Sequence, residues 1–382
     1  MAIKPFTINV DQAQIDDLRT RLENTIMPSE IKDGGWAYGP THKYMSNVID
    51  RILNKYDWKK HEAQINQYPQ FTTEIDGQNI HFLHIESKEE NATPLMLIHG
   101  WPGSIVEFLN VIEPLTNPTK YGGKAEDAFH LVIPSIPGFG FSGPTKEAGW
   151  NTDRIAAAFT NLMAELGYER YGVQGGDAGA VIAPSMGRQA ADNIIGIHLN
   201  AATMGFIPMG PVDEKDIATM TDNEKARMQR VQKFMSERFA FNMLHSTRPQ
   251  SLAYAISDSP AGLIAWMSDL FTSFGENEDM VDRDAFITNF MVYWFSGTAA
   301  SSIRLYYEDM HDPNAWTPKE NSGVPTGVAV FQEGDVAIRR FGEQGNTIAR
   351  WTEYEKGGHF AAMEVPETLV SDVRAFYADL KK

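Results

Sequence analysis

Hydrophobic positions along the chain change their spacing from one region to the next. Near the N-terminus they recur every three to four residues, as Ile15, Leu18 and Leu22 do, and this spacing predicts amphipathic helices. Two alternating runs follow, separated by Asp76-Gly77, which is the pattern of a β-hairpin. Short apolar runs then alternate with helical segments. This rhythm predicts a largely parallel sheet covered by helices.

The alternation of strands and helices stops near Ala202 and resumes near Pro325. The stretch between these points reads as helices and loops, and a helical insertion at this place predicts a cap over the sheet. The last two core strands and a final amphipathic helix follow it. The predicted organisation is an N-terminal helical extension, a first core part, a helical cap and a second core part, at residues 1–68, 69–203, 204–310 and 311–382.

The charge balance argues against two classes of partner. The chain has 33 basic and 50 acidic residues, and a net charge of −17 disfavours nucleic acid and anionic membrane surfaces. No apolar run approaches the roughly 18 residues that a membrane span requires, and no signal peptide is visible. We therefore expect a cytoplasmic protein without a membrane anchor. The absence of cysteine removes disulfides, thiolate metal sites and a cysteine nucleophile.

The most informative motif is Gly175-Gly176-Asp177-Ala178-Gly179, which joins a short strand to a helix. It has the form of the nucleophile elbow of α/β-hydrolases, with aspartate in place of the usual serine. A carboxylate is already ionised at neutral pH, so it can attack an electrophilic carbon and leave an alkyl ester on the enzyme. The alternative reading is an aspartate that only caps the following helix.

The other parts of such a site occur in the order that the fold requires. The loop at 99–104 follows a buried strand, and the N–H groups of Trp101 and Ala178 are predicted to form an oxyanion hole. A glycine-rich loop near the C-terminus carries the candidate base His359. Its acidic partner should follow the strand that ends near residue 331, where both Glu333 and Asp335 occur. The spacing along the sequence to His359 favours Glu333. The remaining histidines, His245 among them, read as surface or core residues.

Taken together, these motifs resemble the microsomal-type epoxide hydrolases, a branch that includes juvenile hormone epoxide hydrolases and soluble bacterial members. The resemblance covers nearly the whole chain. It implies an α/β-hydrolase fold with a mostly parallel central sheet, a helical cap insertion and an N-terminal helical extension. The matching segments are 70–77, 99–104, 137–142, 175–179, 258–262, 324–327 and 357–362.

The resemblance also implies a reaction. Asp177 would open a small apolar epoxide, Tyr306 would donate a hydrogen bond to the emerging alkoxide, and water activated by His359 would hydrolyse the ester. The expected partners are therefore the epoxide and water, with no metal and no cofactor. A homodimer is a separate expectation, since the sequence itself does not fix the oligomeric state.

Two positions depart from the family pattern. Ala178 stands where the family usually has tryptophan, which keeps the backbone donor but removes a wall of the pocket. Phe241 stands where a second epoxide-activating tyrosine is expected, and phenylalanine has no hydroxyl to donate. We expect Phe241 to line the substrate site, and Tyr254 or Tyr307 to supply a compensating hydroxyl.

Two other functions use much of the same machinery. A haloalkane dehalogenase has the same nucleophile but needs indole donors for the halide, and Ala178 argues against it. A catalytically altered homologue that binds a small apolar ligand under the cap is the non-enzymatic alternative. The retained nucleophile, base and oxyanion loop argue against that reading.

Overall fold

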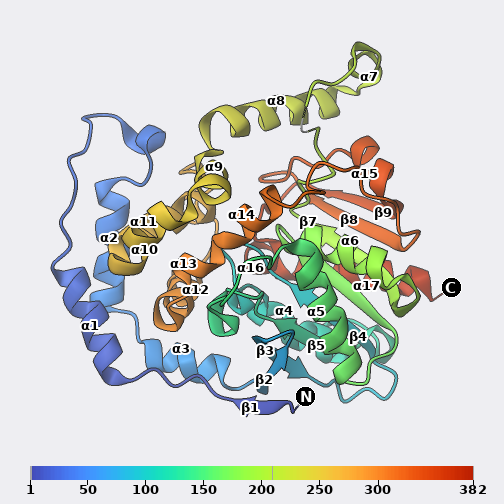
Figure 1. Ribbon diagram of the computed structural model, residues 1–382, viewed down its shortest axis with the longest axis horizontal. Helices are drawn as coiled ribbons and strands as arrows, with labels where there is room; N and C mark the ends of the chain where they lie inside the picture. The colour runs from blue at the N-terminus through green and yellow to red at the C-terminus, as the bar shows by residue number, and fades with distance from the viewer. Residues whose placement is uncertain (1, 209, 382) are drawn as a thin grey trace.

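A twisted nine-stranded sheet forms the centre of the computed structural model, which describes residues 2–208 and 210–381 (Figure 1). The strand order is β1-β2-β3-β5-β4-β6-β7-β8-β9. Pairing from β5 through β9 is parallel, whereas β1, β2 and β3 are antiparallel to their neighbours. The strands are β1 (Lys4–Phe6), β2 (Gln70–Ile75), β3 (Gln78–Ile85), β4 (Thr93–Ile98), β5 (Phe129–Pro134), β6 (Tyr171–Gly176), β7 (Ile194–Asn200), β8 (Pro325–Phe331) and β9 (Thr347–Tyr354).

Helices cover both faces of the sheet, which is why the central strands are apolar along nearly their whole length. On one face α4 (Leu109–Thr116) packs against α17 (Pro366–Leu380). On the other, α5 (Thr152–Glu165) packs against α6 (Gly179–Gln189). The short helices α15 (Arg339–Gly345) and α16 (Ala361–Glu364) belong to the C-terminal part of the core.

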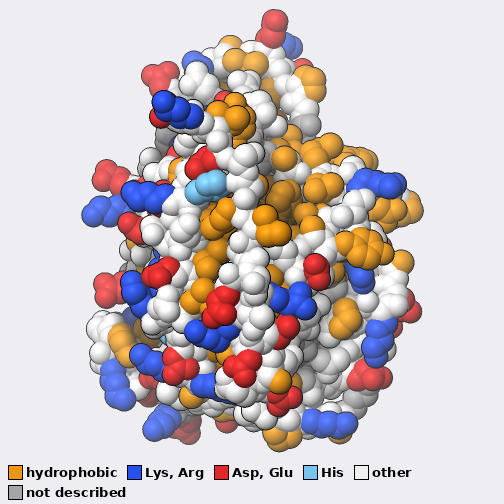
Figure 2. Space-filling view, turned by 90° about the vertical axis from the view of Figure 1, so that its left-hand side faces the viewer, with side chains coloured by type: hydrophobic (Ala, Val, Ile, Leu, Met, Phe, Trp, Pro, Cys, Tyr) orange, Lys and Arg blue, Asp and Glu red, His pale blue; other side chains and the backbone are white. Residues whose placement is uncertain are grey.

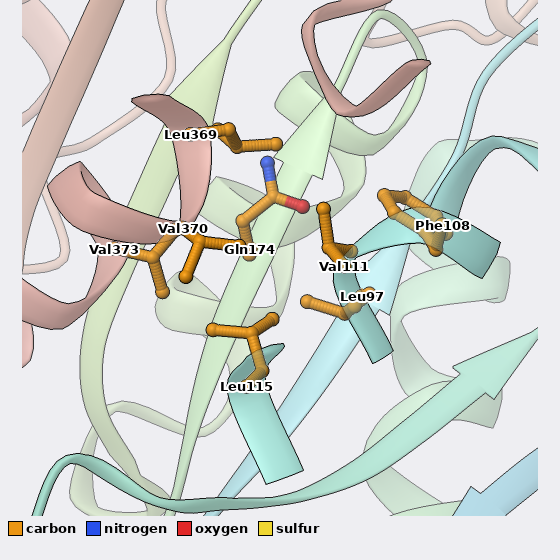
Figure 3. Close-up of a pocket in the computed structure, with 8 residues that line it drawn as sticks. All are labelled: Leu97, Phe108, Val111, Leu115, Gln174, Leu369, Val370 and Val373. Carbon is orange, nitrogen blue, oxygen red and sulfur yellow. The ribbon is translucent and has the colours of Figure 1, made fainter. Parts of the chain in front are cut away.

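A small cavity lies between the sheet and the pair α4 and α17 (Figure 3). The Gln174 side chain, from β6, is the polar member of an otherwise apolar lining. Its Nε2 donates to Asn200 Oδ1 at 2.7 Å, while its Oε1 has no partner among the described residues. This cavity is a packing gap of the core, lined by Leu97, Phe108, Val111, Leu115, Gln174, Leu369, Val370 and Val373.

The N-terminal region wraps around one side of the molecule (Figure 1). It contains α1 (Gln12–Glu23), α2 (His42–Asn54) and α3 (Trp58–Ile65), and Thr41 Oγ1 caps α2 by accepting from the N–H of Tyr44. Strand β1 was not predicted. It pairs with β2, so this region also extends the edge of the sheet.

Helices α7 to α14 lie between β7 and β8, where the sequence predicts an insertion. Helices α7 and α8 project from the body, and α10 and α11 lie beside the N-terminal helices (Figure 1). Helix α12 is largely buried and ends where Gly297 takes a φ of 66°. The bounds are α7 (Glu214–Thr219), α8 (Asp222–Glu237), α9 (Ala240–Thr247), α10 (Pro249–Asp258), α11 (Pro260–Phe271), α12 (Arg283–Ser296), α13 (Ala299–Ser302) and α14 (Arg304–Met310).

On the face that carries the N-terminal region, charged side chains of both signs dominate the lower part, whereas hydrophobic side chains gather in the upper part (Figure 2). Mixed charges are typical of a surface in contact with water. Within the described residues, none of the helices combines the length and apolar character that a membrane crossing needs.

Candidate active site

Asp177 lies in the sharp turn between β6 and α6, with a φ of 54°. The flanking positions must be glycine because any side chain there would collide with neighbouring backbone atoms. A Cβ on Gly175 would lie 2.2 Å from the carbonyl oxygen of Gly179, and a Cβ on Gly179 would lie 2.1 Å from that of Ile98. Aspartate is one of the few non-glycine residues that tolerate left-handed backbone. The local sequence therefore dictates a strained turn that raises Asp177 above the strand ends.

The loop after β4 holds one oxygen of this carboxylate. The Trp101 N–H donates to Asp177 Oδ1 at 3.0 Å. Gly100 permits the approach, because a Cβ there would lie 2.2 Å from the same oxygen. Ala178, the other predicted donor, is the N-cap residue of α6, where backbone N–H groups have no partner within the helix.

Helix α12 fixes the shape of this loop through side chains that the sequence did not single out. Asn289 Nδ2 donates to the carbonyl of Pro102 at 2.7 Å, and its Oδ1 accepts from Ser104 Oγ at 2.7 Å. The Tyr293 hydroxyl donates to the carbonyl of Gly103 at 2.6 Å. Three hydrogen bonds from the insertion therefore hold the backbone that carries the Trp101 N–H.

His359 faces the second oxygen of Asp177. It lies on the loop between β9 and α16, and its Nε2 is 3.6 Å from Asp177 Oδ2. Burial lowers the pKa of His359, while the carboxylate of Asp177 acts in the opposite direction. A lowered pKa favours the neutral imidazole, which is the form that can accept a proton from water. The side chains remain 27% exposed for His359 and 22% for Asp177, so a small molecule can reach them.

Glu333 lies beside the histidine loop and is tied to its backbone. Glu333 Oε2 accepts from the Gly357 N–H at 2.7 Å, and the Glu333 N–H donates to the Gly357 carbonyl at 3.1 Å. Gly334 packs so closely that a Cβ there would lie 2.8 Å from the backbone nitrogen of His359. The acid loop and the histidine loop thus form one packed unit.

Asp335, the alternative acid, is bound differently. Its Oδ2 accepts from the N–H groups of Phe331 at 3.0 Å and Ala201 at 3.4 Å. Burial raises the pKa of Asp335 to about 7. Neither Asp335 nor Glu333 makes a hydrogen bond to the His359 ring among the described residues, so the choice between them stays a prediction.

Aromatic rings from two helices of the insertion close over the Trp101 side of the site. Phe241, on α9, stacks on Trp101 with ring centroids 5.7 Å apart and an interplanar angle of 14°. Tyr306, on α14, meets both rings edge-on at 6.4 Å and 6.2 Å. Burial, and then the Asp177 carboxylate, raise the pKa of Tyr306 well above its ordinary value. Its hydroxyl therefore stays protonated at neutral pH and can donate a hydrogen bond.

His245 is a member of the same wall, although the sequence reading left it as a surface or core residue. Its ring centroid is 4.5 Å from that of Trp101 and 5.0 Å from that of Tyr306. A signal for this existed in the sequence, because His245 follows Phe241 by four residues and shares its helix face.

The two tyrosines expected to compensate for Phe241 do not lie in this wall. Tyr254 is 75% exposed on α10, which removes the structural basis for its predicted substrate-binding role. Tyr307 points away on α14, where its ring stacks on His311 with centroids 3.9 Å apart. Consecutive helical residues face different directions, so Tyr306 and Tyr307 cannot serve one site together.

Two carboxyl groups beside the site, one buried and one partly buried, were also missed by sequence reasoning. Burial, followed by the charges of Asp177 and Glu364, raises the pKa of Glu107 to about 8. Glu107 belongs to the short 3-10 segment Ile105–Phe108. Glu364 Oε1 accepts from the Phe360 N–H at 2.8 Å, and burial raises the pKa of Glu364 to about 7. No cluster of three or more His, Asp or Glu side chains suited to a metal ion occurs within the described ranges.

The sequence matches two family models. The family described as Epoxide hydrolase N terminus matches residues 3–108, and the family described as alpha/beta hydrolase fold matches residues 93–273. Epoxide hydrolase 1 of Sus scrofa is 31% identical over 412 residues, which cover 100% of this chain and 90% of that protein.

Solved structures give the same picture. The Aspergillus niger epoxide hydrolase has a TM-score of 0.84 and 30% identity, covering 100% of this chain and 97% of the other. The juvenile hormone epoxide hydrolase of the silkworm Bombyx mori has a TM-score of 0.88 and 28% identity, covering 100% and 95%. The α/β-hydrolase fold predicted from the sequence is confirmed.

Proposed function

We propose that this chain, which belongs to the epoxide hydrolase family, converts a small apolar epoxide to a vicinal diol through an ester on Asp177. The observation that carries the proposal is the unequal treatment of the two Asp177 oxygens. Oδ1 accepts a backbone hydrogen bond from Trp101, and Oδ2 faces His359 Nε2 at 3.6 Å. One oxygen is held in place, and the other lies next to a base.

In the first step, Asp177 Oδ2 attacks a carbon of the oxirane ring from the side opposite the carbon–oxygen bond. That bond breaks, and its electron pair stays on the oxygen. The Tyr306 hydroxyl, kept protonated by its raised pKa, donates to the developing alkoxide. The apolar rings of Trp101 and Phe241 provide a surface for the rest of the substrate.

In the second step, neutral His359 removes a proton from a water molecule, which attacks the ester carbonyl. The carbonyl oxygen is the former Oδ1, so the Trp101 N–H is already placed to stabilise the oxyanion, together with the N–H of Ala178. Collapse of this intermediate breaks the ester bond to the product oxygen. The two protons of the water end on the two product oxygens, one of them by way of His359, which restores neutral His359 and the Asp177 carboxylate and releases the diol. We assign Glu333 as the acid that stabilises the histidine, because it is bonded to the loop that carries His359.

The insertion acts as the cap of this site, since α9 and α14 supply the aromatic wall and α12 holds the oxyanion loop. We keep residues 204–310 as the bounds of the cap, between the two core parts and after the N-terminal extension. A cytoplasmic location and a homodimer remain predictions.

Trapping the ester tests this function directly. A His359→Gln variant should form the ester without hydrolysing it, so incubation with small aryl and alkyl epoxides should raise the intact protein mass by the mass of the epoxide. The increase should disappear when Asp177→Asn is added. His311→Gln, a matched change at an exposed histidine, should turn over without accumulating an adduct. A folded His359→Gln protein that gains no mass from any epoxide would contradict the proposal. A mass gain with loss of halide from haloalkanes would indicate dehalogenation instead.

A further inference from the structure

His245 has one ring nitrogen that is bonded and one that is not. It lies on α9 and is fully buried. Its Nε2 accepts from the Trp266 indole N–H, on α11, at 2.9 Å. Its Nδ1 is buried and has no hydrogen-bond partner among the described residues.

The bond from Trp266 fixes the position of the proton on this ring. An indole nitrogen can only donate, so His245 Nε2 must be the unprotonated acceptor. Burial lowers the pKa of His245 to about 3, and the ring is therefore neutral at physiological pH. A neutral imidazole carries one proton, and here that proton must lie on Nδ1. The buried group without a partner is thus an N–H donor.

A buried N–H donor without a partner has lost its hydrogen bonds to water, so its position needs a reason. The ring lies in the aromatic wall, with its centroid 5.0 Å from Tyr306 and 5.8 Å from Phe241. Tyr306 in turn lies close enough to Asp177 for the carboxylate to raise its pKa. In the proposed reaction the Tyr306 hydroxyl binds the oxirane oxygen, so that oxygen would lie on the side of the site where His245 packs.

We propose that the Nδ1–H of His245 is a second catalytic donor, which binds the oxirane oxygen together with the Tyr306 hydroxyl and stabilises the alkoxide. This rests on the proposed function. As the Asp177–carbon bond forms and the ring carbon–oxygen bond breaks, both donors strengthen their hydrogen bonds to the oxygen. The alkoxide is finally neutralised by the proton that His359 removes from water. Trp266 is a positioning residue that holds His245 in the donating tautomer.

The test is the rate of ester formation, measured by quenched intact mass spectrometry in the His359→Gln background with styrene oxide as the probe. His245→Leu and His245→Gln should slow the reaction by about 10²–10³, the usual effect of losing one such donor. His245→Asn should stay within about tenfold of the parent, because the asparagine amide nitrogen occupies the place of Nδ1, whereas that of glutamine occupies the place of Nε2.

Phe241→Tyr supplies a rescue. A hydroxyl on this ring enters the same wall one helical turn away. Adding Phe241→Tyr to His245→Leu should therefore raise the rate of ester formation at least tenfold. A purely structural role for His245 would not be repaired by a hydroxyl at another position. Thermal melting of each variant verifies that the comparison is made between folded proteins.

Trp266→Phe tests the tautomer separately. Nitrogen NMR of histidine-labelled protein should show His245 as the neutral Nδ1–H form in the parent and as a mixture of forms in Trp266→Phe, with slower ester formation. Equal rates in the parent and His245→Leu, or a His245 ring that carries its proton on Nε2, would overturn the inference while leaving the ester mechanism intact. Absence of any ester in the parent would overturn the proposed function and this inference with it.

Discussion

Two aspartate–histidine pairs in this chain are built in opposite ways. His198, on β7, and Asp372, on α17, are fully buried and 2.9 Å apart. The other oxygen of Asp372 accepts from Arg350 at 2.7 Å and from the Tyr354 hydroxyl at 2.8 Å. Burial alone would raise the pKa of Asp372, but the hydrogen bonds and charges of these partners lower it instead.

The pair at the candidate site has a carboxylate oxygen that is not satisfied by hydrogen bonds from the described residues. Asp177 and His359 are 3.6 Å apart and partly exposed, and the carboxylate oxygen that faces His359 has no hydrogen bond among the described residues. A buried charge is stable only when its partners satisfy it, whereas a nucleophile needs a lone pair that a substrate can approach. The two pairs therefore differ in whether the carboxylate oxygens are all satisfied by the protein or one is left open to a small molecule.

The largest effect should come from removing the nucleophile. Asp177→Asn keeps the shape and the left-handed backbone but loses the charge, so kcat should fall by about 10⁴–10⁶, as for other residues of a catalytic triad. Its melting temperature should equal or exceed that of the wild type, because the asparagine side-chain oxygen can still accept from the Trp101 N–H while the partly buried charge is removed. The rate of diol formation checks the expected loss of kcat, and thermal melting checks the expected melting temperature. A strongly destabilised Asp177→Asn protein would mean that this carboxylate also has a structural role.

Glu333→Gln should lower kcat by about 10²–10⁴ through loss of the charge that stabilises the histidine after it takes a proton. The amide oxygen can still accept from the Gly357 N–H, so the loop should keep its shape. Ester hydrolysis should slow much more than ester formation, and single-turnover kinetics separate the two steps. A loss of this size in Asp335→Asn, with Glu333→Gln near wild type, would transfer the role to Asp335.

Asp372→Asn should have the opposite pair of effects to Asp177→Asn, because it should lower stability and leave activity unchanged. It leaves Arg350 without its buried counter-charge, so the free energy of unfolding should fall by about 3–5 kcal/mol. Activity per folded molecule should be unchanged. Because the folded-state pKa is lowered, the stability from this group is present above about pH 4 and lost as the pH falls further.

Urea denaturation between pH 3 and pH 8 measures this prediction. Asp279→Asn, a matched change at a side chain that is 94% exposed, should have no measurable effect on stability. A neutral result for Asp372→Asn at pH 7 would show that the buried cluster contributes nothing.

Asp335→Asn should change the free energy of unfolding with pH in the direction opposite to that of Asp372→Asn. Burial raises the pKa of Asp335 from 3.8 to about 7, so its protonated form is favoured in the folded state. The wild type therefore loses stability as the pH rises through this window, and the neutral amide does not. Relative to wild type, the variant should gain stability from about pH 4 to about pH 7 and then level off. A difference that does not change with pH would contradict the assignment.

Local patterns were enough to predict the sheet, the insertion and the elbow. The turn at Asp177 follows from glycines two residues on either side, and His359 from its glycine-rich loop after the last strand. Strand β1 was missed because three residues with a proline carry no readable alternation.

The remaining features depend on contacts between distant segments. The donor state of His245 is set by Trp266, which lies 21 residues away on another helix. The burial of Glu107 and the exposure of Tyr254 depend on tertiary packing, which local patterns do not specify. The choice between Glu333 and Asp335 depends on side-chain direction within one short loop, which periodicity does not specify.

The measurement that tests the central claim most directly is a single turnover in ¹⁸O-labelled water, with enzyme in excess over epoxide. If Asp177 is the nucleophile, the oxygen added to the epoxide comes from the Asp177 carboxylate. The diol of the first turnover should then carry no label, and the peptide that contains Asp177 should gain ¹⁸O. Direct attack of water on the epoxide, with Asp177 as a base, would give labelled diol and an unlabelled peptide. That second result would contradict the account.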